Sequence, residues 1–236
     1  MIHLHPTAPL APRALLPGDP GRALALAQLL LRAPRMFNHH RGLWGYTGAA
    51  LADGELLTIQ STGMGGPSAA IVLEELCDAG LAVAVRVGTC GALAPGLGLG
   101  DLVVAREALA ADGASRALGT GERVAADPGL TEALERGAAG TGPARAGLVA
   151  STDLFYDPDP ERAVGWAREG ALAIEMEAAT VLQVAQRRGV RAGVLLAVTD
   201  TFAADGARTR IDAEALVVAE QALGRAAAMA LVAPAE

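Results

Sequence analysis

The chain has 236 residues, of which 52% are hydrophobic and 3% aromatic, and its formal net charge is −7. This length and apolar content suit one large α/β domain, with a core built from Ala, Leu and Val. The acidic balance argues against a general nucleic-acid-binding protein, which needs a basic face to displace counterions from phosphates. No stretch reaches the roughly 18 uninterrupted apolar residues of a membrane span, so we expect no membrane partner.

Several side chains that catalysis often uses are missing or badly placed. All 19 Lys and Arg residues are Arg, which excludes a Schiff base on lysine and the lysine of a P-loop. Cys77 and Cys90 have neither metal-site nor disulfide spacing, and no signal-peptide pattern opens the chain, so we expect a cytoplasmic location. Any catalysis should therefore depend on carboxylates, arginines and backbone N–H groups.

Strand and helix patterns alternate along the chain. We expect, in order, a strand ending at Leu16, a helix over Arg22–Leu31, a strand over Leu56–Gln60, a helix over Pro67–Ala79, strands over Leu81–Val87, Leu102–Ala105, Ala146–Ala150 and Ala171–Ile174, a helix over Ala178–Arg188, a strand over Val194–Val198 and a helix over Asp212–Leu231. The stretch Asp112–Gly142 is expected to hold an insertion or loop. The alternation predicts an α/β fold with helices on both sides of one sheet, in a single domain over residues 1–236.

Glycine-rich segments follow several of the predicted strands. They are Pro17-Gly18-Asp19-Pro20, Ser61-Thr62-Gly63 and Gly88-Thr89-Cys90-Gly91. Ligands of open α/β sheets lie outside the carboxyl ends of strands, where glycines let backbone N–H groups approach an anion. One such turn alone serves equally well to reverse the chain. Arg22 and Arg86 lie beside two of them, which favours a phosphate or nucleotide pocket.

Carboxylates form the other candidate features. Strand alternation would send Glu175 and Glu177 to one side, where they could accept hydrogen bonds from ribose hydroxyls; the alternative is helix N-terminal charge, stabilised by the macrodipole. Asp200 follows the apolar strand that ends at Val198. Burial there would raise its pKa and make it a general acid, whereas the alternative is an N-cap of the next segment.

Taken together, the segments resemble the nucleoside phosphorylase family, which includes hexameric purine nucleoside phosphorylases and uridine phosphorylases. The matching motifs, in family order, are LLPGDPGRA at Leu15–Ala23, RGLWGYTG at Arg41–Gly48, STGMGGPSAAIVLEEL at Ser61–Leu76, RVGTCGAL from Arg86, STDLFYDPD at Ser151–Asp159, EMEAA at Glu175–Ala179 and VTD at Val198–Asp200. The resemblance implies a three-layer phosphorylase/hydrolase-like fold, with a central mixed, twisted sheet flanked by helices.

The resemblance also implies roles for individual residues. The residues matching phosphate-binding positions are Gly18, Arg22, Arg41, Arg86 and Thr89, with Arg41 reaching a neighbouring subunit's site. The residues matching ribose contacts are His3, Met64, Met176 and Glu177, with His3, or its near neighbour His5, crossing to the ribose 5′-hydroxyl of a neighbouring subunit. The residues matching the base pocket are Cys90, Gly91, Phe155, Ile174 and Glu175. Asp200 matches the acid that protonates the base, with Arg208 or Arg210 as its helper.

The implied reaction is cleavage of a nucleoside by inorganic phosphate, a co-substrate, without a metal or organic cofactor. The implied assembly is a homo-hexamer, a trimer of dimers with active sites shared across the dimer interface. Asp200, and the absence of a Gln-x-Arg motif after Phe155-Tyr156, favour purines over the alternative of a uridine phosphorylase. A methylthioadenosine/adenosylhomocysteine nucleosidase or a non-catalytic nucleoside-binding protein fits less well, because the chain keeps both its phosphate arginines and its acid.

Overall fold

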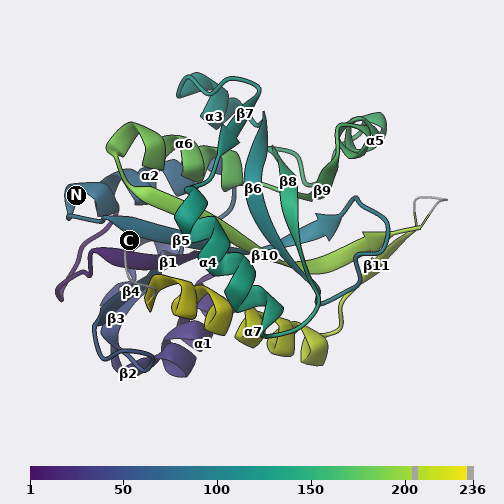
Figure 1. Cartoon of the computed structure of the whole chain (residues 1–236). Coiled ribbons are helices and arrows are strands. Elements are labelled where there is room, and N and C mark those ends of the chain that lie inside the picture. The colour runs from purple at the N-terminus through teal and green to yellow at the C-terminus, as the bar shows by residue number, and fades with distance from the viewer. Residues whose placement is uncertain (204–206, 233–236) are drawn as a thin grey trace.

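The computed structural model describes residues 1–203 and 207–232 (Figure 1). Its elements in chain order are β1 (Arg13–Pro17), α1 (Pro20–Leu30), β2 (Leu31–Asn38), the short 3₁₀ helix η1 (His40–Gly42), β3 (Gly45–Ala50), β4 (Leu56–Gln60), α2 (Gly66–Asp78), β5 (Val83–Ala92), β6 (Leu102–Ala111), α3 (Gly113–Ala117), β7 (Arg123–Ala125), α4 (Pro128–Ala139), β8 (Ala144–Thr152), α5 (Glu161–Arg168), β9 (Ala171–Glu175), α6 (Ala178–Arg188), β10 (Arg191–Phe202), β11 (Arg208–Arg210) and α7 (Ala213–Val232).

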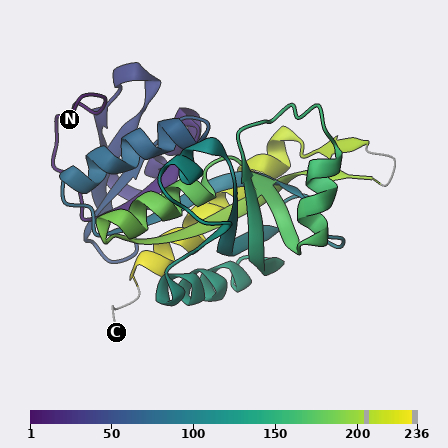
Figure 2. The same cartoon turned by 90° about the horizontal axis from the view of Figure 1, so that it is seen from above.

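Helices cover both faces of an 11-stranded sheet, as expected (Figures 1 and 2). Helices α2, α3 and α6 pack together on one face, and α1, α4 and α7 pack on the other, while α5 lies against β9. Small and branched aliphatic side chains fill both interfaces, for example Leu73 and Val181 on one face and Leu134 and Leu223 on the other. The three-layer α/β architecture expected from the resemblance is confirmed.

Part of the sheet closes into a ring. Strand β5 pairs with β10 and β9, β10 with β6, β6 with β8, and β8 with β9, in a mixture of parallel and antiparallel pairings. From β5 the sheet continues through β1, β4, β3 and β2 to an open edge. This closure depends on pairings between strands far apart in the sequence, and a pattern within one strand does not reveal it.

Two expectations about local structure were wrong. The segment Gly88–Gly91 is not a turn but the second half of β5, because the extended chain there pairs with β10 and β9. The stretch Asp112–Gly142 is not a loop but contains α3, β7 and α4. Helix α4 carries an ordinary start signal, since the Asp127 side chain accepts a hydrogen bond from Leu130 N at 2.8 Å and a proline begins the helix.

Within the described residues, α7 is the one helix long and apolar enough to cross a membrane by length and composition. Its inner face, including Ala219, Leu223 and Ala227, is buried in the core that it shares with α1 and α4. Packing in this core accounts for the apolar side chains of that face, whereas Val217, Val218 and Met229 are exposed.

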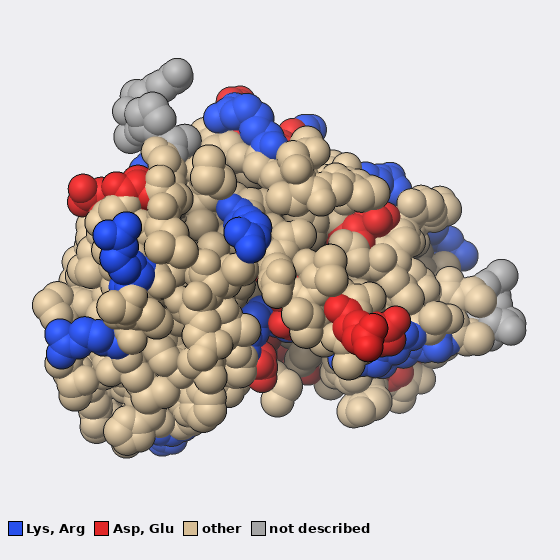
Figure 3. Space-filling view, turned by 90° about the horizontal axis from the view of Figure 1, so that it is seen from below, with Lys and Arg blue, Asp and Glu red and all other residues tan. Residues whose placement is uncertain are grey.

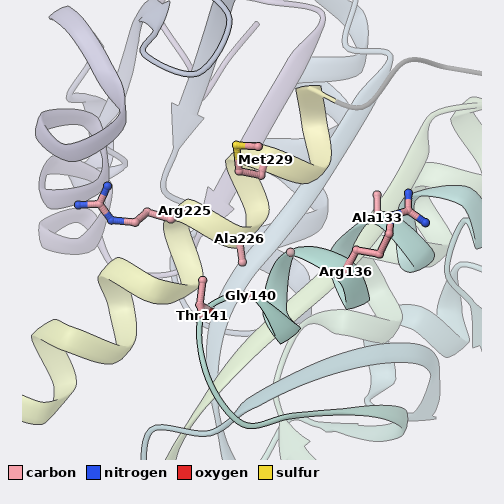
Figure 4. A pocket seen from close by; sticks show the side chains of 8 residues that line it. Ala133, Arg136, Gly140, Thr141, Arg225, Ala226 and Met229 are labelled. Atoms are coloured by element: carbon pink, nitrogen blue, oxygen red, sulfur yellow. The ribbon is translucent and has the colours of Figure 1, made fainter.

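Helices α4 and α7 approach closely because Gly137 has no side chain. A Cβ atom at Gly137 would lie 2.8 Å from the carbonyl oxygen of Ala226 in α7. A hollow of about 410 Å³ remains beside this contact, and the side chains of Arg136 and Arg225 point to opposite ends of it (Figure 4). Since its charged groups do not converge, this hollow lacks the arrangement expected of a ligand site.

Replacing Gly137 with Ala should destabilise the protein by about 1–3 kcal/mol, because the clash is with backbone and no rotamer relieves it. The thermal midpoint should fall by about 3–10 °C in scanning calorimetry. Gly165 in α5 is the matched control, since a Cβ there would have nothing within 4 Å, and Gly165→Ala should stabilise by up to about 1 kcal/mol. Equal midpoints for the two variants would contradict the close helix contact.

Candidate active site

A cavity of about 430 Å³ opens where the glycine-rich segments, the β9–α6 junction and the β10–β11 hairpin meet. All the predicted site residues line it except His3 and Arg41. Those that do are Gly18, Arg22, Met64, Arg86, Thr89, Cys90, Gly91, Phe155, Ile174, Glu175, Met176, Glu177, Asp200, Arg208 and Arg210. The face of the molecule seen from below is hollowed near its middle, and its basic and acidic side chains are interspersed rather than gathered into one basic surface (Figure 3).

Arg86 is a buried cation with an unused donor. Its Nε donates to Glu175 Oε2 at 3.0 Å, and its Nη2 donates to Glu177 Oε2, while Nη1 has no hydrogen-bond partner among the described residues. Burial opposes the charge, but the two carboxylates outweigh it and raise the pKa of Arg86. Arg86 lines the cavity, and its Nη1 is buried without a partner among the described residues. A permanently charged guanidinium with an unsatisfied donor beside a cavity has the chemistry of an anion site.

Gly88 makes this placement of Arg86 possible. A Cβ atom there would lie 2.8 Å from Arg86 Nη2 and 3.1 Å from Leu196 Cδ2. The side chain of Arg86 therefore lies across bare backbone within β5. Gly88, which the sequence predicted to lie in a turn, is therefore a strand residue whose missing side chain leaves room for Arg86.

The other predicted phosphate ligands lie at the start of α1. The Asp19 side chain accepts a hydrogen bond from Arg22 N at 2.7 Å and begins the helix, whose N-terminus favours an anion. Arg22 Nε donates to Glu220 Oε1 of α7 at 2.7 Å, which fixes the arginine at the edge of the cavity. Gly18 packs against the β4–α2 turn, where Gly63 has a φ of +73°, a conformation that favours glycine.

The two glutamates of the β9–α6 junction differ in what their oxygens contact. Glu175 accepts hydrogen bonds from Ser151 Oγ at 2.5 Å and from the backbone N–H groups of Glu177 and Ala178 at 2.9 Å, so it stabilises the helix start, in keeping with the alternative left open for the pair. Glu177 accepts a bond from Gly65 N at 2.5 Å in addition to that from Arg86. Burial and the nearby Glu175 raise the pKa of Glu177, although Arg86 opposes the shift.

Asp200 lies within a strand, so the N-cap alternative is wrong. Strand β10 continues to Phe202 and pairs with β11, which places Asp200 opposite Arg210. The pairing of β10 with β5 shifts between Val198 and Asp200, so Thr199 is an extra residue in a bulge. The bulge breaks the alternation of the strand, and both Thr199 and Asp200 line the cavity while Val198 stays in the core.

Both candidate helper arginines contact Asp200. Arg208 Nε donates to Asp200 Oδ1 at 2.8 Å, and Arg210 Nη1 lies 3.2 Å from the same oxygen. Thr199 Oγ1 donates to Asp200 Oδ2 at 2.8 Å. The sequence left open which of Arg208 and Arg210 assists Asp200. In the structure both contact its carboxylate, because they lie two residues apart on β11 and so point to the same side of the strand.

The expectation of a raised pKa at Asp200 was wrong. Burial does raise it, but the hydrogen bonds from Arg208 and Thr199 and the charges of Arg208 and Arg210 together lower the pKa below its ordinary value. At neutral pH Asp200 is therefore ionised in the ligand-free protein.

Two aromatic side chains that line the cavity, Phe155 and Phe202, are partly exposed. The Arg208 guanidinium lies over the ring of Phe155, 4.7 Å from its centroid. Phe202 packs close to Gly91, where a Cβ would lie 3.1 Å from its ring. Phe202 and Thr199 also line the cavity but were not predicted as site residues. Thr199 directly precedes Asp200 and Phe202 follows it by two residues, so their position beside a candidate acid was the signal that could have identified them.

His3 and Arg41 do not line the cavity of their own chain. His3 Nδ1 lies 2.8 Å from Glu75 Oε1 on α2, and Arg41 is exposed in η1 with a φ of +57°. Either residue would have to reach a ligand in the cavity of another copy of the chain. In the part of the chain that the structure describes, no three His, Cys, Asp or Glu residues lie together as a metal-binding group.

Known proteins are similar to this chain in sequence and in fold. A family model described as the phosphorylase superfamily matches residues 12–233. A DeoD-type purine nucleoside phosphorylase of Geobacillus kaustophilus is 37% identical over 82% of this chain and 83% of that protein. A guanosine phosphorylase of Halorubrum lacusprofundi is 38% identical over 81% of this chain and 79% of that protein.

Among solved structures, a uridine phosphorylase of Vibrio fischeri superposes with a TM-score of 0.84 at 24% identity, covering 94% of this chain and 92% of that one. At that identity the likeness establishes the fold alone. The family model and the two relatives over 30% identical go further: this chain belongs to the phosphorylase superfamily.

Proposed function

We propose that this protein cleaves purine ribonucleosides with inorganic phosphate, giving the free base and ribose 1-phosphate. The observation that carries the proposal is one cavity with a buried, incompletely paired Arg86 on one wall and Asp200, held by Arg208 and Arg210, on another. The purine and guanosine phosphorylases among its relatives support the choice of substrate.

In the proposed reaction, Arg22, Arg86, Thr89 and the backbone at Gly18 hold phosphate beside C1′ of the ribose. A bond forms between a phosphate oxygen and C1′ while the bond from C1′ to N9 of the purine breaks, and that electron pair leaves with the base. The anionic phosphate offsets the positive charge that develops on the sugar. The ribose hydroxyls would bind Glu177 between Met64 and Met176, and the base would lie against Cys90, Gly91, Phe155, Ile174 and Glu175.

Protonation at N7 makes the purine a neutral leaving group, and we assign this proton to Asp200. Because its pKa is lowered, few molecules of free protein carry the proton at neutral pH, but the protonated form gives it up readily. The arginines Arg208 and Arg210 then stabilise the carboxylate that remains. A uridine phosphorylase, the alternative, would have no N7 to protonate and would leave this arrangement without a role.

For the protein as a whole, we propose a cytoplasmic, single-domain enzyme that needs no organic cofactor or metal. We also propose a homo-hexamer of three dimers, in which His3 and Arg41 complete the neighbouring cavity. Their position outside their own cavity supports this arrangement.

Replacing Asp200 with Asn should lower kcat for inosine by about 10²–10⁴-fold, because the amide has no acidic proton to give. The same variant should cleave 7-methylinosine at close to the wild-type rate, since that base is already cationic and needs no proton. Initial rates with both substrates at saturating phosphate make the comparison. Equal losses on the two nucleosides would mean that Asp200 is not the acid.

Phosphate should be required for cleavage. We expect release of hypoxanthine from inosine to follow phosphate concentration to saturation, with ribose 1-phosphate as the sugar product, and little cleavage of uridine. Chromatography of base and sugar products measures both. Base release that continues at full rate without phosphate, yielding free ribose, would indicate a nucleosidase instead.

A shared active site predicts that two damaged variants restore each other. Arg41→Ala lacks the contribution to the neighbour, whereas Asp200→Asn lacks the acid of its own cavity. In a mixed dimer, one cavity combines an intact Asp200 with an intact Arg41 from the partner. Co-expressed, differently tagged chains should therefore give a purified hybrid that is more active at low phosphate than either variant alone. Activity no higher than the average of the two would argue that each site is built from one chain.

A further inference from the structure

One carboxylate, Glu75 of α2, contacts three consecutive residues of the N-terminal segment. Its Oε1 accepts hydrogen bonds from Ile2 N at 2.9 Å and from His3 N at 2.9 Å, and its Oε2 accepts one from Leu4 N at 2.7 Å. The His3 ring adds a fourth donor through Nδ1, 2.8 Å from Oε1. Four donors from three consecutive residues thus converge on one side chain from the last turn of α2.

This arrangement is built into the fold rather than lying loosely on it. Leu4 is fully buried in the core beneath α2. Asn38 Oδ1 accepts a bond from His5 N at 2.9 Å, and His40 Nδ1 lies 3.1 Å from the carbonyl oxygen of His3. Burial alone would raise the pKa of Glu75, but its backbone hydrogen bonds outweigh that and lower the pKa to about 2. Glu75 is therefore ionised throughout the physiological range.

An ionised carboxylate only accepts hydrogen bonds, which fixes the state of the His3 ring. Nδ1 must carry the proton that points at Glu75. In the neutral ring the other nitrogen, Nε2, is then an acceptor, and it has no partner among residues 1–203 and 207–232. The His3 side chain is 27% exposed, so Nε2 is available to a ligand outside its own chain.

We propose that Glu75 is a positioning residue that holds His3 with Nε2 presented as an acceptor for the 5′-hydroxyl of a nucleoside in a neighbouring copy. The inference rests on the proposed function for its substrate, and on the contacts of Glu75 for its geometry. A glutamine at this position would keep one oxygen but turn an NH₂ group toward backbone N–H donors. The segment would then lose its fixed position, and so would the ring.

The kinetic test compares inosine with 5′-deoxyinosine, which lacks the hydroxyl. Glu75→Gln should lower kcat/KM for inosine about tenfold, mainly through KM, as expected for one lost hydrogen bond. The value for 5′-deoxyinosine should change less than twofold. His3→Ala should show the same pattern, and the double variant should lose no more than either single one. Equal losses on both nucleosides, or additive losses in the double variant, would overturn the positioning role.

Glu74→Gln is the matched control, because it makes the same change one residue away on the same helix. Glu74 pairs with Arg188 on the surface, and among the described residues it has no hydrogen bond or ion pair with the N-terminal segment. It should behave as wild type with both nucleosides. A loss on inosine comparable to that of Glu75→Gln would mean that the effect belongs to α2 in general.

A second measurement does not depend on enzymatic activity. Aminopeptidase should remove Met1–Leu4 from Glu75→Gln several times faster than from the wild type or from Glu74→Gln, as followed by intact mass. If the wild type cleaves no nucleoside, the proposed function fails, and the trimming rates still decide whether Glu75 holds the segment. Equal trimming of all three proteins would overturn that contact.

Discussion

The buried cluster of Arg86, Glu175 and Glu177 is the interaction on which the rest of the site depends. It joins the middle of β5 to the end of β9 and the start of α6, and through Glu177 it also holds the backbone at Gly65. Buried charges are costly unless they are paired, and removal of one partner from such a cluster typically destabilises a protein by about 3–5 kcal/mol. The cluster is therefore structural, yet it leaves the buried Nη1 of Arg86, a residue that lines the cavity, without a hydrogen-bond partner among the described residues. The fold thus holds the Arg86 guanidinium in place, and we expect a bound anion to accept the hydrogen bond that Nη1 does not make within the protein.

Asp200 shows a similar balance between burial, which favours the neutral carboxyl group, and neighbouring charges, which favour the ionised one. Asp200 is buried enough for its carboxylate to favour the neutral form, but Arg208 and Arg210 reverse this and keep it ionised. A low pKa has two effects on a general acid: it lowers the fraction of molecules that carry the proton, and it makes the protonated form a stronger acid. Arg208 also stacks on the ring of Phe155. The arginine that keeps Asp200 ionised therefore also contacts the aromatic side chain that lines the cavity.

The sequence predicted the layers and most of the site because both rest on local signals. Helix Ala178–Arg188 and strand Leu56–Gln60 have the expected bounds, and the glycines, arginines and carboxylates of the motifs meet in one cavity. The structural features that the sequence did not predict depend on pairing between strands that are far apart in the chain. The turn expected at Gly88–Gly91 is a strand because β10 and β9 pair with it, and the bulge at Thr199 appears only when β10 is set against β5. The lowered pKa of Asp200 follows from a hairpin that brings two arginines back along β10, which spacing alone does not show.

The central claim is that the free donor of Arg86 is the anchor for phosphate. A crystal structure of the protein grown with inorganic phosphate tests it most directly. We predict a phosphate oxygen about 3 Å from Arg86 Nη1, as in an ordinary charge-assisted hydrogen bond, with Arg22 on the same anion. A cavity without bound anion at a phosphate concentration that saturates turnover, or an anion bound away from Arg86, would contradict the account.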